Sequence, residues 1–134
     1  MMSHFSTIKI KIKNPNIDLL KNTVNRIAQE TGGQIVEEIR DANYNTLIQG
    51  RDFVIGFTND TFYRGVGIRI DENGEVRLVG DFWRVSQEGI EKFKQLLVQR
   101  YASEAMKYSL MKLGYKVQEQ KVQNKIVIHA MEVM

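Results

Sequence analysis

Hydrophobic and polar residues alternate strictly from Ile8 to Lys13, within a predicted strand that covers residues 5–13. The alternating positions are Ile8, Lys9, Ile10, Lys11, Ile12 and Lys13. A period of two is typical of a strand with one buried and one solvated face. Asn14-Pro15 ends the strand, because proline cannot donate to a β-ladder. We therefore predict an N-terminal strand whose solvated face carries three lysines.

The pattern then changes to the period of a helix. Asn16 is a suitable N-cap, and the apolar residues that follow it fall on one helical face. These residues are Ile17, Leu20, Val24, Ile27 and Ala28. Thr31-Gly32-Gly33 ends this helix, since glycine readily takes the left-handed conformation of a C-cap.

Short β-type runs separated by turn residues fill the middle of the chain. Candidate strands cover residues 34–40, 46–49, 52–58, 62–70 and 75–82. The run 46–49 is the shortest, so three to five strands are possible here, and four is the expected number. The last two runs predict a hairpin around residues 71–74. Gly65 and Gly67 lack the context of a Rossmann loop and favour a bulge or bend in the sheet.

A long helix follows, with Ser86 as its N-cap. Residues 87–113 would extend roughly 40 Å at ~1.5 Å per residue. Two apolar stripes run along it: Ile90, Phe93, Leu97, Tyr101, Ala105 and Tyr108 form one, and Val98, Ala102, Met106, Leu110 and Leu113 form the other. Their centres lie roughly 140° apart at ~100° per residue. Such a wide arc predicts packing on more than one element, within the chain or in a dimer.

Residues 115–122 and 125–131 predict a closing hairpin that turns at Gln123-Asn124. The expected order is therefore strand, helix, four strands, helix, two strands, in a single domain over residues 1–134. Runs of neighbouring strands with helices set apart favour an α+β fold, with a mainly antiparallel curved sheet and two helices on one face. This order is similar in shape to the TATA-binding-protein and helix-grip architectures, an analogy that carries no function.

The amino-acid composition excludes several kinds of functional site. The chain has no cysteine, which excludes thiolate metal sites, disulfides and thiol catalysis. No stretch has the length of a signal peptide or a membrane span, so we expect no membrane contact and a location in the cytoplasm, or in the plastid stroma if the protein is organelle-encoded. The net charge of +3 permits anionic partners without indicating one.

The titratable residues form no catalytic or metal-binding pattern. His4 and His129 are the only histidines, and they lack the spacing of metal ligands. The carboxylates fall mostly in turns and on solvated strand faces, where nothing perturbs them toward acid–base catalysis. We therefore predict no catalytic residue, no metal and no cofactor. A non-enzymatic protein is favoured, and the question of enzymatic activity stays open.

Two features are candidates for binding. Trp83 and Arg84 lie between a predicted strand and the long helix, where they could stack on a base, a ring or a partner side chain. The alternative is that Trp83 closes one end of the core. Lys9, Lys11 and Lys13 could form a basic sheet surface, whereas alternating lysines also keep an edge strand soluble. In both cases the structural interpretation is favoured.

Several short motifs in the chain are similar to those of a known protein family. They are Ser3-His4-Phe5, Trp83 before the long helix, Gln99-Arg100-Tyr101-Ala102 and Gly114-Tyr115. The chain resembles a conserved hypothetical reading-frame family of cyanobacteria and algal plastids, a domain-of-unknown-function family. The likeness extends over nearly the whole chain except residues 33–51 and 122–134. It implies no reaction, cofactor or catalytic residue, but it adds His4, Phe5 and Tyr101 to the candidate binding residues.

Three functions are open on this basis. The preferred one is a non-catalytic binding or accessory protein that acts through protein–protein contacts, with a protein partner or as a homodimer. The second is a nucleic-acid-binding module that uses the three lysines and Trp83. The third is a small-ligand or enzymatic site in a curved sheet gripped by the helix, lined by Phe53, Phe57, Tyr101 and Tyr108.

Overall fold

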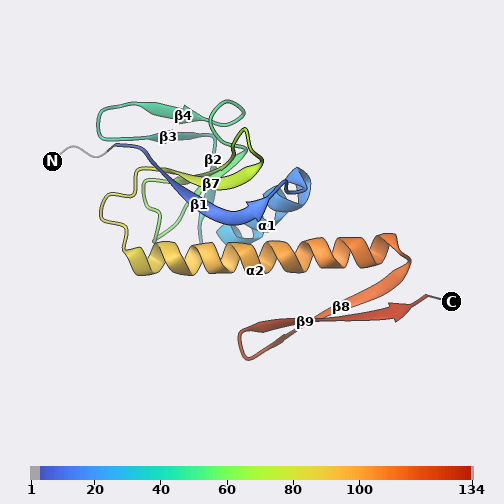
Figure 1. The fold of residues 1–134 in the computed structure, drawn as a ribbon. Coiled ribbons are helices and arrows are strands. Elements are labelled where there is room, and N and C mark those ends of the chain that lie inside the picture. The colour runs from blue at the N-terminus through green and yellow to red at the C-terminus, as the bar shows by residue number, and fades with distance from the viewer. Residues whose placement is uncertain (1–3, 134) are drawn as a thin grey trace.

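The structure is a computed structural model that describes residues 4–133. It has the expected α+β architecture, with mostly antiparallel strands (Figure 1). The helices are α1 (Ile17–Glu30) and α2 (Gln87–Lys112). The strands are β1 (Ser6–Lys13), β2 (Gln34–Val36), β3 (Glu38–Arg40), β4 (Thr46–Ile48), β5 (Ile55–Thr58), β6 (Val66–Ile70), β7 (Glu75–Gly80), β8 (Tyr115–Val122) and β9 (Lys125–Glu132).

The main sheet has five antiparallel strands in the order β1-β7-β6-β5-β2. Both helices lie on one face of this sheet, as predicted (Figure 1). Between the two layers lies the main core, to which β1 contributes Ile10 and Ile12. Phe57 is fully buried there, and its ring centroid lies 6.2 Å from that of Phe62 and 5.5 Å from that of Phe93. The core is therefore solid at its centre.

The strands between the helices differ from the prediction, because the structure has six of them where four were expected. The run 34–40, expected as one strand, divides at Glu37 into β2 and β3. β2 joins β5 in the main sheet, whereas β3 pairs with β4 in a separate hairpin. Two adjacent glutamates, Glu37 and Glu38, interrupt the apolar alternation, and the chain crosses to the outer face of the sheet at this point.

A second, smaller core lies on that outer face, under the β3–β4 hairpin. It consists of Ile39, Phe53 and Val79. The Phe53 ring lies directly over two glycines, because a Cβ at Gly56 or at Gly67 would stand 2.8 Å from its nearest ring atom. Gly67 therefore makes room for an aromatic ring rather than for the bulge or bend that we predicted.

Helix α2 packs on two different elements. Its N-terminal half buries Ile90, Phe93 and Leu97 in the main core. Its C-terminal half carries the β8–β9 hairpin on another side, away from the main sheet (Figure 1). Ser103 Oγ of α2 donates a hydrogen bond to Glu119 Oε1 of this hairpin at 3.4 Å. The wide apolar arc is thus used only in part within the chain, because Met106 and Leu113 stay exposed, and the closing hairpin forms a two-stranded sheet of its own.

Local signals at the ends of the elements are confirmed. The side chains of Asn16 and Ser86 accept a hydrogen bond from the N–H three residues on in α1 and α2, at 3.1 and 3.0 Å. The turn between β8 and β9 falls at Gln123 and Asn124, both with positive φ. The two N-cap hydrogen bonds explain why both helices begin where the sequence predicts.

Candidate binding groove along helix α2

The residues singled out by the sequence lie in two groups rather than in one site. His4 and Phe5 precede β1, which begins opposite the end of β7, so they share one end of the sheet with Trp83 and Arg84. His4 is exposed, and Phe5 packs on the outer-face core. Ser3 of the same motif lies outside the described residues. The lysines of β1 continue from this end toward the opposite one.

Trp83 lies half-buried at the junction between β7 and α2. The guanidinium carbons of Arg64 and Arg84 stand 4.9 and 4.3 Å from its ring centroid. Arg64 also forms a 2.7 Å ion pair with the buried Asp81, which accepts a hydrogen bond from the Trp83 N–H. The Tyr63 hydroxyl donates to the Trp83 carbonyl at 2.8 Å. These contacts tie the end of the sheet to the start of α2.

The hydrogen bond to Asp81 also raises the pKa of Arg64 above its ordinary value, because a carboxylate acceptor stabilises the charged guanidinium. Arg64 therefore stays protonated throughout the usual pH range. The indole ring already has two guanidinium groups beside it. This arrangement matches the structural interpretation of Trp83 better than that of an open stacking surface.

Tyr101 serves a contact inside the fold. Its side chain is half-buried against the main core. Its hydroxyl accepts a hydrogen bond from the Asn16 N–H at 2.8 Å, which joins α2 to the start of α1. Tyr101 is therefore placed to hold the two helices together.

The four residues proposed to line a small-ligand pocket do not come together. Phe57 is fully buried in the main core, whereas Phe53 lies in the outer-face core on the other side of the sheet. Tyr108 is 41% exposed beside Lys112 of the same helix. Tyr101 is occupied by its contact with α1.

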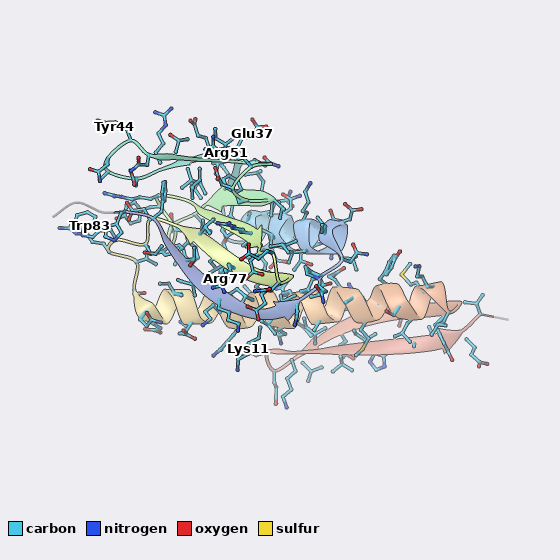
Figure 2. The ribbon with its side chains drawn as sticks, turned by 45° about the horizontal axis from the view of Figure 1, so that its top comes forward. Lys11, Glu37, Tyr44, Arg51, Arg77 and Trp83 are labelled. Carbon is cyan, nitrogen blue, oxygen red and sulfur yellow. The ribbon has the colours of Figure 1, made fainter. Side chains whose placement is uncertain are left out.

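The lysines of β1 lie on an edge strand. β1 pairs only with β7 among the described strands, so its other side is free of strand partners. Lys9 forms a 3.2 Å ion pair with Glu75. Lys11 and Lys13 have no carboxylate at ion-pair distance within residues 4–133. Figure 2 shows Lys11 projecting from β1 over the side of α2.

A row of hollows follows α2 from Glu91 to Met106, one beside the free edge of β1 and the other two beside the β8–β9 hairpin. We call it the α2 groove. It consists of three adjoining hollows of about 710, 500 and 410 Å³. Gln99 borders all three hollows and Gln95 borders two, so the hollows adjoin one another around these two side chains. Gln99 Nε2 also donates to the Asn124 carbonyl at 2.9 Å, which holds the hairpin tip against the helix.

The rim of the α2 groove is strongly cationic. Its basic side chains are Lys9, Lys11, Lys92, Lys94, Arg100, Lys121 and Lys125. Glu91 is the single carboxylate among the residues that line the described hollows. Some of these cations have partners: Lys94 pairs with Glu91 at 3.3 Å and Arg100 with Glu30 at 2.9 Å. In the described chain, Lys11, Lys121 and Lys125 have no ion-pair partner, so the rim keeps an uncompensated positive charge.

The ion pair between Arg100 and Glu30 shifts the pKa values of both groups. The hydrogen bond with Arg100 is the main reason that the pKa of Glu30 is lowered, and Lys121 contributes a smaller attraction. The same bond raises the pKa of Arg100. Both groups therefore stay charged at neutral pH.

The floor of the α2 groove is aliphatic. Val98 lies in the hollow beside β1, Leu96 in the hollow beside the hairpin tip, and Ala102, Met106, Ile126 and Ile128 in the third hollow. Met106 is 55% exposed, which leaves much of its side chain in water. No aromatic residue lines the hollows within the described part of the chain. The groove therefore offers apolar contact area framed by positive charge.

The sequence indicated part of this surface and missed the rest. Lys9 and Lys11 were candidates, and the stripe with Val98, Ala102 and Met106 predicted a second packing surface on the long helix. Lys121 and Lys125 were missed, because only the fold brings the hairpin tip against α2. Their one signal in the sequence is that they flank a two-residue turn.

Two searches for other site types are negative over the described residues. In positions 4–133, no three His, Cys, Asp or Glu side chains gather as metal ligands would. No helix in this range combines the length and the hydropathy needed to cross a membrane. Comparison with known proteins adds nothing to the site, because no family model, no curated protein and no solved structure matches the chain. The likeness to the plastid and cyanobacterial reading-frame family stays a prediction.

Proposed function

We propose that this protein is a non-catalytic binding protein that acts through protein–protein contacts, and that the α2 groove is its contact surface. The partner is a polypeptide segment that carries both acidic and aliphatic side chains. One observation carries the proposal: each of the three adjoining hollows along α2 contains aliphatic side chains, and three lysines without an ion-pair partner in the described chain border them.

Two physical terms support such a partner. Burial of apolar area contributes roughly 25 cal/mol per Å², so aliphatic side chains would gain by covering Val98, Met106 and Ile126. Charges on a rim contribute mainly to encounter rate and selectivity. Acidic side chains would therefore approach Lys11, Lys121 and Lys125 favourably, and basic segments would be rejected.

The same positive charge would attract a nucleic-acid strand, and we propose nucleic-acid binding as the second candidate function. Proteins that hold single strands combine a basic groove with aromatic side chains on which bases stack. The described groove is lined by aliphatic groups instead, and Trp83 lies at the other end of the sheet beside two arginines. An aliphatic floor favours side chains over bases.

Site-specific photo-crosslinking tests the proposal. A photoreactive amino acid replaces Gln95, which is exposed and borders two of the hollows. The tagged protein is irradiated in an extract of its source cells, with and without nuclease. We expect nuclease-resistant adducts whose crosslinked peptides are rich in Asp, Glu and aliphatic residues.

The matched control carries the same photoreactive group at Tyr44. This residue is 83% exposed and lies on the β3–β4 hairpin, across the sheet from α2 (Figure 2). Adducts that form equally at both positions would indicate random encounter. Adducts at position 95 that disappear with nuclease would favour the nucleic-acid function, and an absence of adducts at that position would refute the proposal.

A further inference from the structure

The free edge of β1 suggests how a partner enters the α2 groove. An edge strand presents backbone N–H and C=O groups that can pair with another strand. β1 has eight residues, pairs with β7 alone among the described strands, with a shift of register between Lys9 and Lys13, and borders the largest of the three hollows through Lys9 and Lys11. Backbone pairing is therefore available along one wall of the groove.

The side chains of β1 define what kind of strand fits. Lys9, Lys11 and Lys13 lie on one face of β1, and the buried Ile10 and Ile12 lie on the other. A strand added beside β1 would also place its side chains alternately on these two faces. Its residues beside the lysines would be acidic, and those between them would lie over α2 near Val98.

Charge also argues against a second copy of this chain as the occupant. Two β1 strands paired edge to edge would bring lysines against lysines, and like charges on facing positions of a sheet are destabilising. The same lysines that prevent self-pairing would select an acidic strand.

We infer that the segment bound in the α2 groove is an extended strand of alternating acidic and aliphatic residues, which adds to the free edge of β1 as a sixth strand of the main sheet. This inference rests on the proposed function, since it specifies the partner of the same groove. Backbone hydrogen bonds supply affinity in this mode, and the alternating side chains supply selectivity.

The test uses a blocked eight-residue peptide of alternating Glu and Val, matched to the eight residues of β1. Two derivatives carry N-methyl groups, one on every Glu and the other on every Val. In an added strand, only alternate N–H groups point toward β1. We expect one derivative to bind like the parent peptide and the other to bind roughly tenfold more weakly or not at all, because lost backbone hydrogen bonds accumulate.

Other results would overturn the inference in recognisable ways. Equal binding of both derivatives would mean attraction by charge alone, and equal loss would mean a helical occupant. No binding of the parent peptide would also overturn it. The proposed function is judged separately: adducts at position 95 in the crosslinking experiment would keep the groove as a protein-binding surface, whereas their absence would remove both claims.

Substitutions in the protein test where the peptide binds. Lys11→Glu should weaken parent-peptide binding by about tenfold, because it replaces an attraction with a repulsion beside the added strand. Lys116→Glu is the matched control, since Lys116 is exposed on β8 and borders none of the three hollows. Equal weakening by both substitutions would show that binding follows net charge and not the β1 edge.

Discussion

At the scale of single residues, the structure separates side chains that hold the fold from side chains that are free to bind. Tyr101 and Trp83 were both candidates for binding, yet each makes contacts inside the fold. Lys11 was also a candidate for binding, and it has no ion-pair partner in the described chain. A hydroxyl or a ring gains most at a junction between elements, whereas an unpartnered cation is available to a ligand.

Tyr101 gives a direct test of this separation. Tyr101→Phe removes the acceptor of the Asn16 N–H at the start of α1. We expect the free energy of unfolding to fall by about 0.5–1.5 kcal/mol, the usual net value of one hydrogen bond. Urea denaturation measures this change. Binding of the Glu-Val peptide to the folded variant should stay within the error of wild type, and a selective loss of binding would assign Tyr101 to the site.

Gly56 tests the second core in the same way. Gly56→Ala would place a Cβ 2.8 Å from Phe53 Cε2, so we expect destabilisation by about 1–3 kcal/mol through overpacking. Combining it with Phe53→Leu should cost less than the sum of the two single changes, because leucine lacks the Cε2 atom of the clash. Thermal melts of the four proteins complete this cycle. Additive effects would contradict the close contact.

At the scale of elements, the β6–β7 hairpin depends on one carboxylate. Asp71 accepts hydrogen bonds from the backbone N–H groups of Asn73 and Glu75, both at 2.9 Å, and from Arg77 Nε at 2.8 Å. The bond with Arg77 is the main reason that the pKa of Asp71 is lowered. This loop was predicted from residues 71–74, but the tie to Arg77 was not, because it crosses the hairpin.

A lowered carboxyl pKa has a definite sign in the pH dependence of stability. The stabilisation by Asp71 is fully present above its ordinary pKa of about 3.9 and is lost as the pH falls through the lower folded value. Asp71→Asn should therefore reduce stability at pH 7 and flatten its decline between about pH 4 and pH 2. Urea midpoints of both proteins across this range test the point. Parallel curves would show that Asp71 contributes nothing.

The elements also show where reasoning from sequence succeeds and where it stops. Strict alternation predicted β1, and the side chains of Asn16 and Ser86 predicted the starts of both helices, because these are local effects. The division at Glu37 depends on the outer-face core around Phe53, which no local pattern reveals. The same holds for the position of the β8–β9 hairpin, which depends on which side of α2 remains uncovered by the sheet.

At the scale of the whole molecule, the α2 groove arises from the length of one helix. α2 continues past the sheet, and the hairpin that follows it folds back along α2 on the side away from the main sheet (Figure 1), so that Lys121 and Lys125 border hollows along the same helix. Strand β1, helix α2 and the β8–β9 hairpin thus all contribute basic side chains to the α2 groove. The chain carries a formal charge of only +3, so the binding potential lies in where the charges are placed and not in their sum.

The measurement that tests this account most directly is the crosslinking yield at position 95 in two double variants of equal net charge. Lys11→Glu with Lys125→Glu reverses two unpartnered cations on the rim. Lys112→Glu with Lys116→Glu reverses two exposed lysines that border none of the hollows. We expect the first pair to reduce the yield of protein adducts by about tenfold and the second to leave it near that of the parent. Equal yields in the two double variants would contradict the claim that the α2 groove binds an acidic protein segment.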